Sequence, residues 1–182
     1  SHFLINKEGE KHMGTLTPGQ MYTNMLNPVK GWPSQAALDK SAPVDTVTET
    51  DLSLMKAGSI CCLSSTGGFI RGVTSRAMPI FLFQNANDFD ANSDKYNTSG
   101  GKVSGLVATG SYELQTTEYT TGGTYTYNTL LKADTAGNVG KVVDTAIAQV
   151  TVDVVGICSG PVVTNAYGKQ VLTFWPTYLP KV

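Results

Sequence analysis

The pattern of hydrophobic and polar positions changes near residue 50. From Asp51 onward, short runs rich in apolar and β-branched residues alternate with glycine-containing turns, as is typical of β-strands joined by tight turns. The pattern predicts strands at 59–63, 69–74, 78–84, 102–109, 111–117, 124–132, 138–143, 148–158, 161–164 and 170–175. No α-helix of ordinary length is predicted after residue 50. We therefore expect residues 51–182 to form a mainly β domain, an antiparallel β-sandwich or a small barrel.

Residues 1–50 lack this alternation and hold four of the eight prolines. They predict an extended, Pro-containing N-terminal arm with one short helix, which begins near Thr17-Pro18 and ends before Asn27-Pro28. Isolated apolar residues along the arm are expected to pack on the chain's own domain or on a neighbouring subunit.

The C-terminal tail from Phe174 is apolar and contains Pro176 and Pro180. Proline cannot continue a hydrogen-bonded sheet, so we expect the tail to cover a sheet edge or to dock onto a partner. The candidate neighbour-contacting residues of arm and tail are Phe3, Leu4, Ile5, Trp32, Phe174, Trp175, Tyr178 and Leu179.

Tyrosine and threonine alternate from Tyr119 to Tyr127, which predicts a strand with one aromatic face. Together with Tyr112, these tyrosines are expected to form the half-buried face of a sheet. A sugar-binding face is the alternative.

Charged residues make up 15% of the 182 residues, against about 25% in a typical globular domain. Thirteen basic and 14 acidic residues are scattered without a basic stripe, so we expect no nucleic-acid partner. No apolar run approaches the roughly 20 residues that span a bilayer, and the N-terminus lacks a secretory pattern. We expect a soluble protein, made in the cytoplasm, with no membrane partner.

The three cysteines, Cys61, Cys62 and Cys158, all lie in apolar segments. Their odd number is unsuited to a disulfide framework, so we interpret them as small buried hydrophobic residues. A bridge from Cys61 or Cys62 to Cys158 is the alternative.

Motifs for catalysis are missing from the sequence. The two histidines, His2 and His12, both lie on the predicted arm, and there is no Gly-x-Ser-x-Gly elbow, zinc-type Cys/His pairing or phosphate-binding loop. We expect no enzymatic activity and no cofactor. A weak calcium candidate is the loop with Asp88, Asp90, Asn92 and Asp94, whose alternating oxygens suit a hard cation. Ser93 and Ser99 stand where a calcium loop needs Gly and Glu, so a solvated loop without a metal is the alternative.

The second half of the chain resembles a known class in its sequence style. Tyr127–Val139 and Asp153–Ser159 contain, in this order, an apolar strand, an Asp-x-x-Gly turn and Val-Gly-Ile. This sequence pattern, together with the C-terminal segment Leu172–Pro176, resembles that of bacteriophage head decoration (cement) and minor capsid proteins. The resemblance extends over residues 50–182 and assigns no individual functional residue.

The resemblance implies a virion structural protein on the capsid exterior, assembled in the host cytoplasm. Its partners would be the major capsid protein and further copies of itself, in a homo-oligomer such as a trimer, and many modest contacts would act together. Deleting residues 1–47 is then expected to abolish shell binding while the β domain still folds. Another phage component (tail, fibre or capsid subunit), or a carbohydrate- or calcium-dependent binding module, is the alternative.

Overall fold

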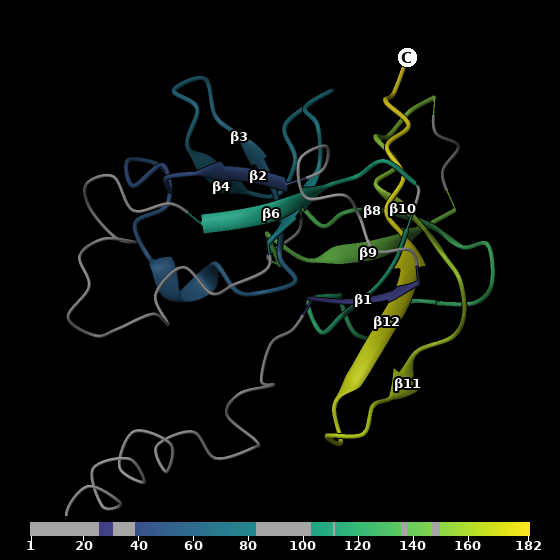
Figure 1. The fold of residues 1–182 in the computed structure, drawn as a ribbon. Helices are drawn as coiled ribbons and strands as arrows, with labels where there is room; N and C mark the ends of the chain where they lie inside the picture. The colour runs from purple at the N-terminus through teal and green to yellow at the C-terminus, as the bar shows by residue number, and fades with distance from the viewer. Residues whose placement is uncertain (1–25, 31–38, 83–102, 111, 136–137, 147–149) are drawn as a thin grey trace, which may run out of the picture.

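The computed structural model describes residues 26–30, 39–82, 103–110, 112–135, 138–146 and 150–182. These residues form two antiparallel β-sheets, which lie side by side in Figure 1 and share a core. The one helix in the described part is a short 3-10 helix, η1 (Leu52–Leu54). The predicted mainly β fold, an antiparallel sandwich or small barrel, is confirmed.

The larger sheet contains seven strands. Its order is β1 (Leu26–Lys30), β7 (Glu113–Thr116), β12 (Gln170–Trp175), β10 (Gly156–Cys158), β8 (Leu130–Ala133) and β9 (Val142–Thr145), and β11 (Val163–Thr164) pairs with β12. The segment after β7 returns to the far side of the sheet, because Tyr119 forms a parallel bridge with Val142 of β9. This bridge curls the larger sheet toward a barrel.

The smaller sheet contains five strands. Its order is β2 (Asp39–Ala42), β6 (Val103–Val107), β5 (Ile80–Leu82), β3 (Ile60–Leu63) and β4 (Phe69–Arg71). The β3–β4 hairpin turns at the predicted Gly67-Gly68, where Gly67 adopts a φ of 83° that side chains other than glycine rarely adopt.

The main core lies between the two sheets. Along β5 and β3, successive side chains point to opposite faces, and Phe81 and Ile60 point toward the larger sheet. There they meet Leu114, Leu172 and Phe174 of the larger sheet, all less than 1% exposed. Burial of these apolar surfaces is the main term that holds the sheets together.

The opposite face of the smaller sheet is also buried. Cys61, Ile80 and Leu82 form a second cluster with Met55 and Phe69 on that side. Because both faces of the sheet are covered, its strands β3 and β5 are continuously apolar rather than alternating.

Each strand predicted from residue 59 onward overlaps a strand of the structure, although most observed strands are shorter. The Tyr119–Tyr127 strand is wrong: the chain makes a turn at Gly122 and reaches regular strand geometry only at Leu130. The hydroxyl of Tyr125 donates to the carbonyl of Thr120, which folds this segment back on itself.

Two strands lie within the predicted N-terminal arm. β1 pairs with β7 in the larger sheet, and β2 pairs with β6 in the smaller one. As far as it is described, the arm is therefore built into both sheets. The predicted helix lies outside the described residues except for Leu26, which belongs to β1.

Candidate functional site

Three apolar side chains form a row across the outer face of the larger sheet. Trp175 of β12 is paired with Ile157 of β10, and Ile157 is paired with Leu130 of β8. Paired residues in neighbouring strands point to the same face of a sheet. The next residues along each strand, Phe174, Cys158 and Leu131, are fully buried in the core, so the row faces away from it. We call Leu130, Ile157 and Trp175 the outer row.

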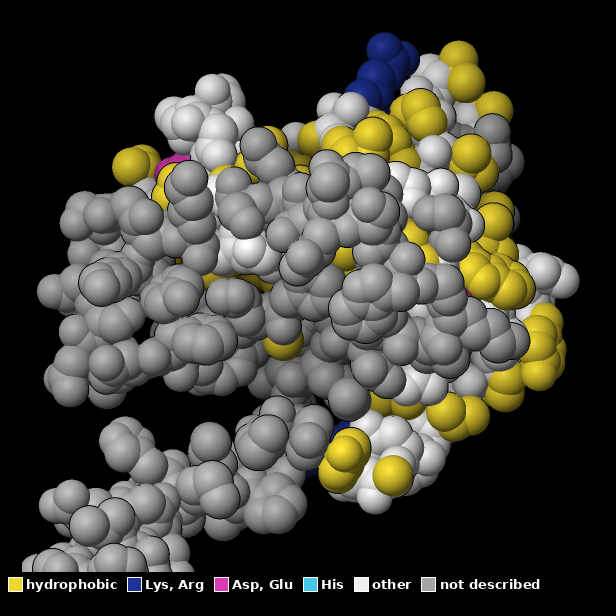
Figure 2. Space-filling view, viewed as in Figure 1, with side chains coloured by type: hydrophobic (Ala, Val, Ile, Leu, Met, Phe, Trp, Pro, Cys, Tyr) yellow, Lys and Arg dark blue, Asp and Glu magenta, His cyan; other side chains and the backbone are white. Residues whose placement is uncertain are grey.

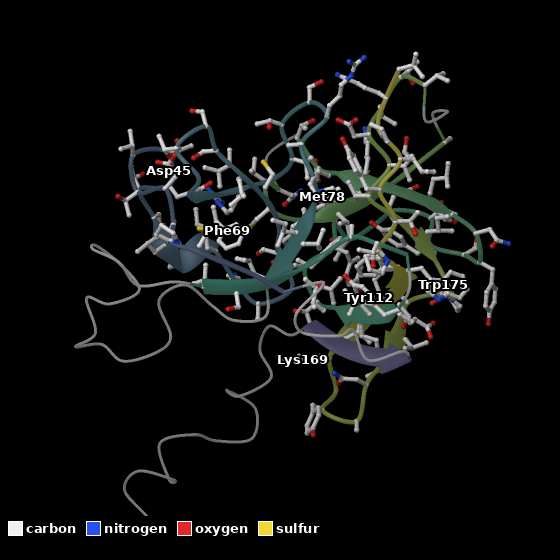
Figure 3. The ribbon with its side chains drawn as sticks, turned by 45° about the horizontal axis from the view of Figure 1, so that its top comes forward. Asp45, Phe69, Met78, Tyr112, Lys169 and Trp175 are labelled. Carbon is white, nitrogen blue, oxygen red and sulfur yellow. The ribbon has the colours of Figure 1, made fainter. Side chains whose placement is uncertain are left out.

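The outer row is partly open to solvent. Trp175 is 38% exposed, and Ile157 and Leu130 are half-buried without joining either core cluster. Figure 3 places Trp175 on the side of the larger sheet, opposite Phe69 and Asp45 of the smaller one. In Figure 2, hydrophobic side chains are visible along this side of the molecule.

Polar groups that already have partners flank the outer row. The amide of Gln115 donates to the hydroxyl of Thr173 over 3.4 Å, and the hydroxyl of Ser159 donates to the carboxylate of Glu113. An apolar centre with a satisfied polar border is the usual arrangement of a protein-binding surface.

The predicted contact residues of the tail differ in their exposure to solvent. Trp175 is exposed in the outer row. The prediction that Phe174 contacts a neighbour is wrong. Its side chain is fully buried against Phe81, so it packs inside the molecule and offers no surface to a neighbour. Tyr178 and Leu179 are half-buried, and Leu179 pairs with Val154 through two backbone hydrogen bonds of 2.9 Å.

The tail is held on its own chain by Asp153. Its carboxylate accepts from the backbone N–H of Lys181 at 2.8 Å and of Arg76 at 3.0 Å. Asp153 thereby joins the tail to the β4–β5 loop of the smaller sheet. The tail thus covers part of its own domain, which is one of the two expectations from its sequence.

The remaining sequence candidates lie outside the described residues. They are Phe3, Leu4, Ile5, Trp32, His2, His12 and the calcium candidates Asp88, Asp90, Asn92 and Asp94. Within the described ranges, no group of three or more His, Cys, Asp or Glu side chains is placed to hold a metal. Across those same ranges, no helix is long and apolar enough to cross a membrane.

The tyrosines belong mostly to the core. Tyr112, Tyr119 and Tyr125 are each less than 9% exposed, and the rings of Tyr119 and Tyr125 pack edge to face at 5.4 Å. They are therefore not available as a sugar-binding face. Tyr127 is 70% exposed and lies outside regular strand structure.

The cysteines are free and buried, as interpreted from the sequence, and the alternative bridge to Cys158 is not formed. Burial raises the pKa of Cys158 to about 11 and raises the pKa of Cys61 as well. A thiol with such a pKa is almost entirely protonated at neutral pH and is a poor nucleophile.

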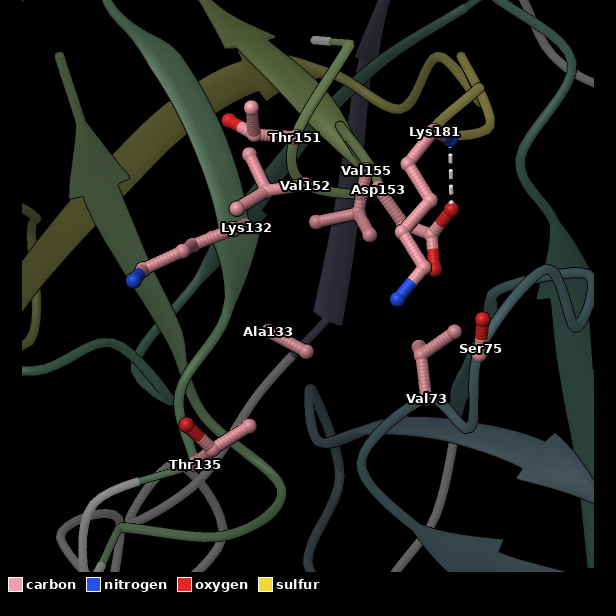
Figure 4. Close-up of a pocket in the computed structure, with 10 residues that line it drawn as sticks. All are labelled: Val73, Ser75, Lys132, Ala133, Thr135, Thr151, Val152, Asp153, Val155 and Lys181. Carbon is pink, nitrogen blue, oxygen red and sulfur yellow. Dashed lines mark hydrogen bonds between the residues drawn. The ribbon is translucent and has the colours of Figure 1, made fainter. Parts of the chain in front are cut away.

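A small pocket of about 190 Å³ opens where the β4–β5 loop, the end of β8, the segment before β10 and the tail meet (Figure 4). Its walls are Val73, Ala133, Val152 and Val155, with the hydroxyl-bearing Ser75, Thr135 and Thr151 and the charged Lys132, Asp153 and Lys181 around them. Its volume is below the roughly 300 Å³ at which pockets for drug-sized ligands begin.

Two residues of the outer row, Ile157 and Leu130, were not among the sequence candidates. They are recognised as part of the row only from the register between strands β12, β10 and β8, which cannot be derived from the sequence. Comparison of the chain with protein-family models, with curated proteins and with solved structures found no match.

Proposed function

We propose that this protein is a virion structural protein that binds the outside of a phage capsid and stabilises it. The observation that carries the proposal is the outer row, an apolar stripe that runs from Trp175 through Ile157 to Leu130 across three strands of the larger sheet. Exposed tryptophan is among the side chains that most often contribute a large share of the binding energy of such a surface.

The mechanism is the burial of the outer row against the capsid surface, repeated over many copies. One row offers a modest contact, since it consists of one aromatic and two aliphatic side chains. Association of several copies, for example as a trimer, would turn weak single contacts into a stable coat through multivalency. The major capsid protein and the chain itself are the proposed partners.

The first test is sedimentation of the native source lysate, with this chain followed by mass spectrometry. The proposal expects it in particles of megadalton size, from which mild denaturation releases it. Recovery only as a small free oligomer would reject the capsid role.

A second test asks whether the outer row is the surface that binds the capsid. Purified chain is added back to stripped particles, and the bound amount is measured for the wild type, Trp175→Ala and Tyr167→Ala. Tyr167 is a matched control, because it is an exposed aromatic residue (49%) in the β11–β12 turn. We expect Trp175→Ala to weaken rebinding at least tenfold and Tyr167→Ala to leave it unchanged. Equal effects of the two substitutions would argue against the outer row.

A further inference from the structure

The pocket of Figure 4 combines an amine with an apolar floor. Lys181 reaches from the tail so that its amine lies above Val73 and faces the space bounded by Ala133 and Val155 (Figure 4). Lys132 lines the opposite wall and extends away from the centre. An ammonium group that faces a partly apolar space lacks some of the water that would solvate it, so an anion there gains a stronger interaction than in bulk water.

The one carboxylate that lines this pocket, that of Asp153, already accepts two hydrogen bonds. Both carboxylate oxygens of Asp153 accept backbone N–H groups, one from Lys181 and one from Arg76. The ion pair found among the described residues joins Arg71 to Glu49, away from the pocket, and no ion pair within 4 Å holds the amine of Lys181 or Lys132. Two lysines and one carboxylate line the pocket, so its lining carries a net charge of +1.

We propose that this pocket binds a carboxylate group carried on a short aliphatic chain. The amine of Lys181 would pair with the carboxylate, and Ser75 and Thr135 add hydroxyl groups to the pocket lining. Val73, Ala133 and Val155 would contact the aliphatic part. At about 190 Å³ the pocket is smaller than sites for drug-sized ligands, so the ligand is a small acid such as a short-chain carboxylate. This proposal stands independently of the capsid role.

The test uses butyrate, a short-chain carboxylate, and butyramide as its uncharged isostere. Each is titrated into the isotopically labelled full chain at low ionic strength, and the backbone amide signals of Val73, Ser75, Asp153 and Lys181 are followed. Butyrate is expected to give saturable shifts that weaken as salt is added, and butyramide to shift these signals at least tenfold more weakly. Equal responses to both ligands, or shifts that do not saturate, would overturn the proposal.

Two variants test whether the amine of Lys181 is the group that binds the carboxylate. Lys181→Gln is expected to lower butyrate affinity about tenfold, the usual scale for losing a charge-assisted hydrogen bond. Lys169→Gln, in the turn between β11 and β12, is the matched control and should bind as the wild type does (Figure 3). Signals remote from the pocket report in the same spectra that each variant is folded. An unchanged affinity of Lys181→Gln would overturn the assignment.

A second ligand separates the two sources of such a carboxylate. Glutamate capped at both ends presents the same group as a protein side chain would. Tighter binding of capped glutamate than of butyrate would assign the pocket to an acidic side chain of a partner protein. Tighter binding of butyrate would assign it to a free short-chain acid.

Discussion

The rings of Phe81 and Phe174 meet across the two sheets, with their centroids 5.0 Å apart and their planes tilted by 57°. Phe81 lies on β5 and Phe174 on β12, strands in the interior of the two sheets. Gly156 of β10 leaves room for this contact, because a Cβ there would lie 2.8 Å from a ring carbon of Phe174. The pair therefore lies at the centre of the contact between the sheets.

We expect Phe174→Ala to destabilise the fold by about 3–5 kcal/mol, since it removes a fully buried ring and leaves a cavity. The neighbouring Trp175→Ala removes a partly exposed ring from the opposite face and should cost less than about half as much. Urea unfolding followed by circular dichroism measures both. Equal losses would mean that Trp175 also has a core role.

The coupling between the two rings can be measured separately. A double-mutant cycle with Phe81→Ala should give an interaction energy of about 0.5–1.5 kcal/mol. A value near zero would show that the rings pack independently.

A second contact between the sheets depends on Glu49 and Arg71. The Glu49 carboxylate, 5% exposed, accepts the backbone N–H of Arg71 at 2.7 Å and its side-chain Nε at 2.8 Å. This holds the aliphatic part of Arg71 against Gly140, where a Cβ would lie 3.3–3.5 Å from the Arg71 side-chain carbons. Gly140 also accepts a hydrogen bond from Ile60 of β3.

We expect Glu49→Ala to cost about 3–5 kcal/mol of unfolding free energy, because it leaves the guanidinium and a backbone donor without their partner. Glu49→Gln keeps an acceptor oxygen and should cost clearly less. Chemical denaturation of both variants is the measurement. An Ala variant as stable as the wild type would show that the carboxylate contributes nothing here.

The pH dependence of stability should carry a contribution from Glu118, which is 6% exposed. Burial raises its pKa above the ordinary 4.5, and the opposing effects of Lys141, Lys56 and Thr117 do not cancel that rise. Above pH 4.5 the unfolded chain therefore ionises first, so the stability from this group is full below that pH and is lost as pH rises through the folded pKa.

Glu118→Gln removes this titration. The unfolding free energy of the variant minus that of the wild type should increase as pH rises above 4.5 and then level off. The opposite pH response comes from Asp45 and Asp51, whose pKa values are lowered mainly by hydrogen bonds from Ser64 and Ser53. Their stabilisation is lost as pH falls through the lowered pKa values, and it should be the same in the variant. A difference that does not vary with pH would contradict the role given to Glu118.

Sequence pattern predicted the strands that contribute to a core, because burial of one or both faces imposes an apolar pattern that can be read directly. The Tyr-Thr alternation failed because Tyr119 and Tyr125 are buried outside regular strands, where each hydroxyl finds its own acceptor. The hydroxyl of Tyr125 donates to the carbonyl of Thr120, and that of Tyr119 donates to the side-chain oxygen of Gln170. β1 was missed because it contains Pro28 and a register shift, which sheet edges tolerate and which leave no strand pattern. The outer row depends on register between strands distant in sequence, so only Trp175 could be proposed from its type.

The place of β1 and β2 in the sheets changes the deletion that tests the N-terminal arm. Removing residues 1–47 would take away both strands and expose the edges of β7 and β6, so we expect loss of stability and aggregation. Removing residues 1–25 leaves every described contact in place and removes Phe3, Leu4 and Ile5. Because it keeps β1 and β2, we expect this shorter deletion to unfold at a higher urea concentration than the longer one, and, under the proposed function, to rebind stripped capsids more weakly than the full chain. Full rebinding by the shorter chain would remove the arm from the mechanism and leave the outer row as the contact surface.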